Sequence, residues 1–101
     1  MVKCVLIGES WGDVRVIDSP LQKDIYTLLK GPGTFIGQYD DVNVVIMKCR
    51  ESIFDLEMNQ NTLPEPFEKE RVLGPILLVR MNENSEPEDF TLQEFLTLYR
   101  L

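Results

Sequence analysis

Three short runs of the sequence are apolar at every position and decide which fold the chain can adopt: Val5-Leu6-Ile7, Val44-Val45-Ile46-Met47 and Ile76-Leu77-Leu78-Val79. Aliphatic runs of this length, rich in β-branched residues, are typical of β-strands. Successive side chains of a strand point to opposite faces of its sheet, so a strand with one wet face alternates apolar and polar residues. None of the three runs alternates in this way. We therefore expect a central sheet that is buried on both faces.

Two amphipathic helices are predicted beside these strands. The first covers residues 20–30, where apolar side chains recur at the spacing of one helix face, and Gly31 ends it. The second begins after Thr91, which with Glu94 forms a capping box. Its expected apolar face consists of Leu92, Phe95, Leu96 and Tyr99. Leu98 and Leu101 fall off that face, so we expect exposed leucines at the end of the chain.

The order of the predicted elements defines the fold class. It reads strand, strand, helix, one or two strands, an irregular segment over 51–70, strand and helix, which does not alternate as βαβ units do. The first two strands are expected to form a hairpin, and Gly37 is a candidate β-bulge. We predict one α+β domain over residues 1–101, with a mixed or mainly antiparallel sheet of about four to five strands and two amphipathic helices.

Two helices of this size are too small to cover both faces of such a sheet. Either the 51–70 segment lies across the second face, or a partner subunit covers it. The second alternative predicts a self-associating protein, a homodimer in the simplest case. We take five apolar residues as candidates for an interface: Trp11, Phe54, Phe67, Leu98 and Leu101. Trp11 lies in the expected hairpin loop, where it either anchors an interface or folds back onto the edge of the core.

The charge of the chain is uneven. The net charge is −7; residues 1–50 hold six acidic and six basic residues, whereas residues 51–101 hold eleven and four. The most acidic stretch is the loop over 82–89, and its acidic patch comprises Glu83, Glu86, Glu88 and Asp89. A negative surface repels phosphate backbones, so direct binding to nucleic acid is not expected, whereas a basic protein would be attracted.

The sequence excludes several kinds of chemistry. It contains no histidine, which removes His-dependent zinc sites and Ser-His-Asp triads. The glycine-rich stretch 31–37 follows a helix, whereas a phosphate-binding loop opens one. The 82–89 loop has Pro87 where a calcium loop needs glycine, which leaves at most a loose cation site there. We predict no catalytic residue, no metal site and no cofactor. Cys4 and Cys49 are expected to be buried thiols, with a disulfide or a reactive thiol as alternatives.

Two blocks of the chain resemble a known family. They run from Gly31-Pro32-Gly33-Thr34-Phe35-Ile36-Gly37-Gln38 to Val44-Val45-Ile46-Met47, and from Leu63-Pro64-Glu65-Pro66-Phe67 to Gly74-Pro75-Ile76-Leu77-Leu78-Val79-Arg80-Met81. Over roughly residues 31–95 the chain is similar to small uncharacterised proteins of microalgae and of large algal DNA viruses. The resemblance implies no activity and no site. It implies an intracellular protein, of a virus or of its algal host.

Three functions follow as hypotheses. The first is a non-enzymatic protein-protein interaction module that self-associates. The second is an acidic decoy that mimics the charge of nucleic acid and occupies a basic protein. The third is a small enzyme that uses carboxylates or a bound metal. The sequence shows neither a signal peptide nor an apolar stretch long enough to span a membrane, so we expect a soluble cytoplasmic protein that does not bind membranes.

Overall fold

The computed structural model describes residues 2–19, 21–50 and 55–100. Strands and helices follow one another as β1 (Val2–Ile7), β2 (Val14–Ser19), α1 (Leu21–Leu29), β3 (Gly33–Tyr39), the 3₁₀ helix η1 (Asp40–Val42), β4 (Val44–Cys49), β5 (Ile76–Met81), β6 (Pro87–Glu88), α2 (Leu92–Thr97) and the 3₁₀ helix η2 (Leu98–Arg100). The fold is α+β, as the order of the predicted elements indicates.

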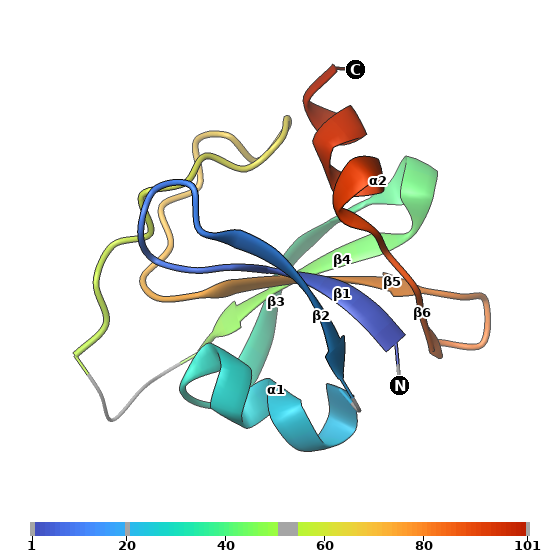
Figure 1. The fold of residues 1–101 in the computed structure, drawn as a ribbon, viewed down its shortest axis with the longest axis horizontal. Helices are drawn as coiled ribbons and strands as arrows, with labels where there is room; N and C mark the ends of the chain where they lie inside the picture. The colour runs from blue at the N-terminus through green and yellow to red at the C-terminus, as the bar shows by residue number, and fades with distance from the viewer. Residues whose placement is uncertain (1, 20, 51–54, 101) are drawn as a thin grey trace.

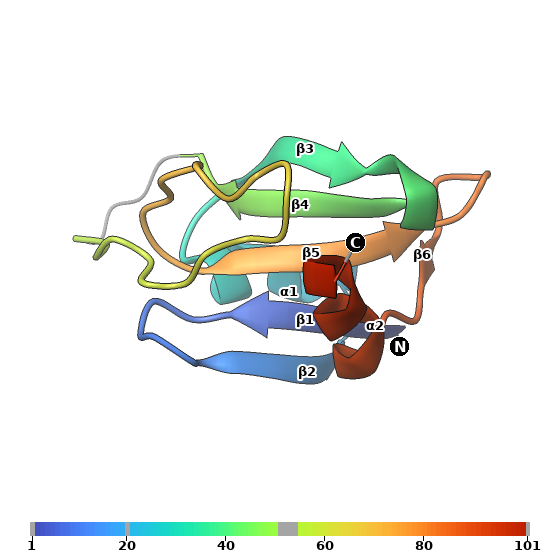
Figure 2. The same cartoon turned by 90° about the horizontal axis from the view of Figure 1, so that it is seen from above.

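The strands form a single sheet in the order β2-β1-β5-β4-β3, with β6 paired to the end of β5. Every pairing is antiparallel. Figure 2 shows the five longer strands side by side, with α2 and α1 on opposite sides of them. The prediction of a loop over 82–89 is wrong at its end, because the turn after Asn82 brings Pro87 back beside Met81 and adds the short strand β6.

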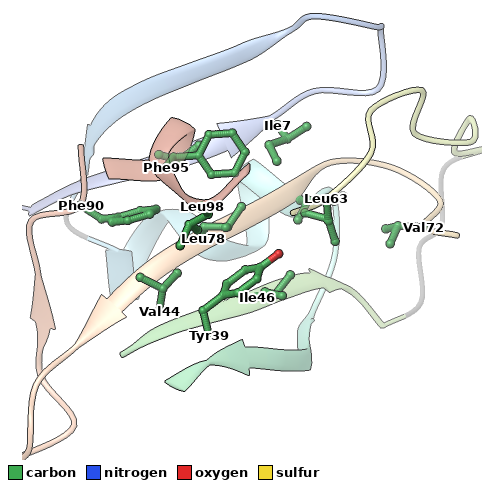
Figure 3. Close-up of a cluster of buried hydrophobic side chains, with 12 residues drawn as sticks. Ile7, Tyr39, Val44, Ile46, Leu63, Val72, Leu78, Phe90, Phe95 and Leu98 are labelled. Carbon is green, nitrogen blue, oxygen red and sulfur yellow. The ribbon is translucent and has the colours of Figure 1, made fainter. Parts of the chain in front are cut away.

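Both faces of the sheet are buried within the single chain. One face carries the larger core, whose buried side chains are Val5, Ile7, Tyr39, Val44, Ile46, Leu63, Val72, Ile76, Leu78, Phe90, Phe95 and Leu98. The other face carries Cys4, Leu6, Leu29, Met47, Cys49, Leu77 and Val79. In Figure 1, α1 covers one side of the sheet and α2 the other. The segment between β4 and β5 adds Leu63 and Val72 to the larger core (Figure 3). Of the two covers that we considered, the intramolecular one is present.

The bulge expected at Gly37 is present in β3. Phe35 pairs with Met47 and Gly37 pairs with Ile46, so the strand contains one extra residue between them. A Cβ atom at Gly37 would lie 2.6 Å from the ring of Phe67, which packs directly on the glycine backbone. The ring of Phe67 also meets that of Tyr39 edge-on, with 5.2 Å between the centroids. Phe67 is therefore partly buried in this chain's own packing, and its selection as an interface residue stays a prediction.

The second helix buries a different face from the one that its sequence predicts. Phe95 and Leu98 are buried, with Leu98 only 5% exposed, whereas Leu96 is 48% exposed. The chain tightens into η2 at Leu98, and a 3₁₀ helix places side chains three residues apart on one line. Leu98 therefore lies beneath Phe95 in the larger core (Figure 3). The prediction that Leu98 is exposed is wrong, and Leu101 lies outside the described residues.

Two matched substitutions in this helix test its orientation. We expect Leu98→Ala to lower the free energy of unfolding by about 3 kcal/mol, because it opens a cavity in the core. Leu96→Ala removes the same atoms from an exposed position and should lower the free energy of unfolding by less than about 1 kcal/mol. Urea denaturation of both variants measures the difference. Equal losses would contradict the described packing of the helix.

Candidate functional site

The hairpin loop between β1 and β2 presents the one tryptophan of the chain. Trp11 is 83% exposed at the tip of this loop, so it does not fold back onto the edge of the core. The amide of Gly8 donates to the carbonyl oxygen of Asp13 at 2.7 Å and closes the loop. Gly12 has a φ of +83°, a conformation that favours glycine and that turns the chain directly after Trp11.

The side chain of Asn61 holds this loop in place. Its Nδ2 donates to the carbonyl oxygens of Gly8 and Ser10, each at 2.9 Å. Its Oδ1 accepts the amide of Gly12 at 2.8 Å. One amide side chain thus satisfies backbone groups on both sides of Trp11. A loop whose polar groups are bound in this way has little freedom left to lose on binding.

A second asparagine, Asn59, holds Asn61 in position through a hydrogen bond. Asn59 is buried; its Nδ2 donates to the carbonyl oxygen of Gly74 at 2.9 Å and to that of Ile7 at 3.3 Å. Its Oδ1 accepts the amide of Asn61 at 2.9 Å. The two asparagines therefore connect the end of β1, the segment before β5 and the loop that carries Trp11.

The carboxylate of Glu9, at the start of the same loop, links this loop to Lys30, which directly follows α1, and to the segment before β5. One carboxylate oxygen lies 2.6 Å from Nζ of Lys30, and the other accepts the amide of Glu57 at 3.0 Å. The hydrogen bond from Lys30 lowers the pKa of Glu9, and partial burial opposes that effect. Glu9 is thus a carboxylate near neutral pH, and both of its oxygens have partners.

Exposed apolar side chains lie at the same end of the molecule as Trp11. An isolated antiparallel bridge joins Met58 to Leu73, and both side chains are exposed. The amide of Gln60, two residues beyond Met58, donates to the carbonyl oxygen of Glu9 in the hairpin loop at 2.8 Å. We name the set of Trp11, Met58 and Leu73 the tryptophan end of the molecule. Figure 1 shows the loops of this end on the left of the sheet.

A polar hollow of about 310 Å³ lies beside the hairpin loop. Its charged lining residues are Glu9, Asp13, Arg15, Lys30 and Glu57. Glu9 pairs with Lys30, and Asp13 pairs with Nε of Arg15 at 3.1 Å. Across the described ranges, no group of three His, Cys, Asp or Glu residues is placed so that it could hold a metal ion.

The acidic residues selected from the sequence lie at the opposite end of the molecule. Glu83, Glu86, Glu88 and Asp89 are all exposed. Asp89 also has a structural role, because its carboxylate accepts the amide of Lys3 at 2.9 Å. The register of the strands brings three more acids to this end: Asp18 is opposite Lys3, and Asp40 and Asp41 lie in η1 just before β4. Acidic residues from both halves of the sequence therefore meet at this end of the sheet.

The structure separates the remaining candidates. Trp11 is exposed, Leu98 belongs to the core, and Phe67 is partly buried against that core. Phe54 lies outside the described residues, as Leu101 does. The residues that the sequence analysis missed are Asn59, Asn61 and Glu9, which position Trp11. The polar run Asn59-Gln60-Asn61 between apolar neighbours was the available signal, but it indicates only a break in regular structure.

The two cysteines are free and buried, which agrees with the expected thiols and excludes the disulfide. Burial raises the pKa of Cys4 to about 11, and the charge of Asp18 adds to the effect. Because only the thiolate is a strong nucleophile, Cys4 is unreactive near neutral pH.

Fold and site together define a small α+β protein with one clamped, tryptophan-bearing loop and one acidic end. The chain belongs to a family of unknown function, DUF5880, whose model matches residues 5–98. No curated protein matches the chain in comparison. No solved structure matches it either. Among the described residues, no helix has the length and apolar character needed to cross a membrane.

The clamp on the loop can be tested with Asn61→Ala. Loss of the three hydrogen bonds around Trp11 should lower the free energy of unfolding by about 2 kcal/mol. The fluorescence anisotropy of Trp11 should fall, because the loop is no longer held. Asn84→Ala, an exposed asparagine at the opposite end, serves as the control and should change neither quantity. An unchanged anisotropy in Asn61→Ala would show that the asparagine does not order the loop.

Proposed function

We propose that the protein is a non-enzymatic protein-protein interaction module whose contact surface is the tryptophan end. One observation carries the proposal: a tryptophan that is 83% exposed lies on a loop fixed by its own hydrogen-bond network. Tryptophan is enriched among the residues that contribute most to binding at interfaces. A preordered loop also lowers the entropic cost of association.

Self-association is the form of this function that we propose first. The bare sheet face that would have required a partner is covered within the chain, so support comes from the exposed apolar side chains instead. Trp11, Met58 and Leu73 at the tryptophan end are the surface that a second copy would contact. A second exposed apolar stripe lies on the outer face of the C-terminal helices, where it comprises Leu92, Leu96 and Tyr99.

A binding role without catalysis agrees with the chemistry of the polar hollow. The depressed pKa of Glu9 makes it a poor general acid or base near neutral pH. We also propose that the protein acts in the cytoplasm, in an alga or in the host of an algal virus as the family resemblance implies. The two free cysteines support a reducing compartment.

The single tryptophan makes the proposal measurable by fluorescence. When protein concentration rises to tens of micromolar, we expect the emission of Trp11 to shift to the blue and its quenching by acrylamide to fall. Light scattering should show the mass doubling over the same range. Trp11→Ala should weaken dimerisation by about thirtyfold, as expected for an interface residue of this kind.

Phe35→Ala is the control, because Phe35 is an exposed aromatic residue on the opposite edge strand β3. It should leave the mass unchanged. A wild-type protein that stays monomeric throughout rules out self-association. Proteins captured from the native cell with the wild type and with Trp11→Ala then test whether the protein binds another partner through Trp11. A partner that is captured equally by both would overturn the proposed interaction module.

The acidic end favours a second candidate function, the decoy that imitates nucleic acid. Its support is the gathering of Glu83, Glu86 and Glu88 with Asp40 and Asp41 at one end of the sheet. A basic protein would be attracted there by long-range electrostatics, which salt screens. This function does not use Trp11.

Competition against DNA tests the decoy. The protein should displace a labelled DNA duplex from a basic DNA-binding domain, and raising the salt concentration should weaken its own binding to that domain. Glu83→Lys with Glu86→Lys should weaken displacement more than Glu68→Lys with Glu70→Lys, which reverses the same charge in the segment before β5. Asp89 stays unchanged, because it also holds the amide of Lys3. Displacement that does not depend on salt contradicts the decoy.

A further inference from the structure

A groove of about 450 Å³ lies between η1, the turn before Phe67 and the end of the C-terminal helix. Its apolar lining residues are Tyr39, Val42, Pro66 and Leu98, and its polar ones are Gln38, Asp40, Asp41 and Glu65. Figure 3 shows Tyr39 and Leu98 among the side chains of the larger core. The groove is distinct from the tryptophan end, because η1 lies at the acidic end of the sheet.

The floor of the groove is built by buried side chains. Tyr39 and Leu98 are both buried, and the hydroxyl of Tyr39 donates to the carbonyl oxygen of Pro64 at 2.6 Å. This hydrogen bond links the end of β3, directly before η1, to the turn that carries Glu65 and Pro66. Burial raises the pKa of Tyr39, so its phenol is neutral and adds no charge to the floor. The groove is therefore preformed, with an apolar base.

The rim of the groove carries negative charge only. Asp40, Asp41 and Glu65 are exposed, and no described side chain that lines the groove is basic. Asp40 accepts a hydrogen bond from Nε2 of Gln38. Arg80 is not a lining residue of the groove; its Nε donates to the carbonyl oxygen of Val42, and its charge is paired with Glu94 at 2.5 Å. Among the described residues, the side-chain carboxylates of Asp41 and Glu65 have no hydrogen-bond or ion-pair partner.

We propose that this groove binds an arginine side chain of a basic protein partner. An apolar floor beneath a rim of carboxylates complements a side chain with a long aliphatic stem and a cationic end. Arginine suits it better than lysine, because the guanidinium group is weakly hydrated, lies flat on apolar or aromatic surfaces and bonds carboxylates through several N–H groups. This proposal does not rest on Trp11. The arginine-binding groove and the proposed contact surface at the tryptophan end can therefore fail independently of each other.

An NMR titration with a short peptide tests the site. The probe is acetyl-Gly-Arg-Gly-amide, and its matched analogues carry lysine or neutral citrulline in place of arginine. In physiological salt, where the Debye length of about 8 Å limits diffuse attraction, the arginine peptide should cause saturable amide shifts confined to residues 38–42, Glu65 and Leu98. The lysine peptide should bind more weakly, and the citrulline peptide should cause no saturable shift.

Two double variants separate a specific groove from general acidity. Asp41→Asn with Glu65→Gln should weaken binding of the arginine peptide about fivefold. Glu83→Gln with Glu86→Gln removes the same charge from the acidic end outside the groove and should leave binding unchanged. Thermal denaturation checks that all variants stay folded. Equal binding of the citrulline peptide, or an equal loss in both double variants, would overturn the proposal.

Discussion

The constraint on which the rest of the structure depends is that β5 must be sheltered from water on both faces. Ile76 and Leu78 point into one core, and Leu77 and Val79 point into the other. With β1 and β4 as its neighbours, β5 forms the two-sided centre of the sheet. Burial of apolar surface at roughly 25 cal/mol per Å² is the main favourable contribution to folding. The helices and the segment before β5 are arranged to provide that shelter.

This arrangement leaves the ends of the strands for other roles. α1 and α2 lie on opposite faces of the sheet, and the loops that join the strands lie at its two ends (Figure 2). At one end, the segment before β5 covers the larger core and also supplies Asn59 and Asn61 to the loop of Trp11. At the other end, η1 and the turn after Asn82 bring the acidic residues together. Core packing thereby determines which surface groups become neighbours.

The sequence predicted part of the candidate site. It identified Trp11 by its residue type and its place in a turn, and it identified the acidic loop by composition. It did not predict the clamp, because Asn61 is 49 residues from Gly12, and only the folded chain brings the two together. It also predicted that Leu98 is exposed, whereas Leu98 is buried. The burial of Leu98 depends on a change from α to 3₁₀ geometry, and the packing of Phe67 depends on the bulge at Gly37; hydrophobic periodicity can detect neither.

By itself, the sequence determined the fold class, the expectation that both faces of the sheet are buried, the bulge in β3 and the capping box of α2, since each follows from local patterns of apolar, glycine and capping residues. Only the tertiary structure decided the strand order, which segments cover each face of the sheet, and which residues lie beside each charged side chain. These depend on contacts between residues far apart in the chain. A local pattern determines which side of a helix or strand is apolar, but it does not determine which other element packs against that side.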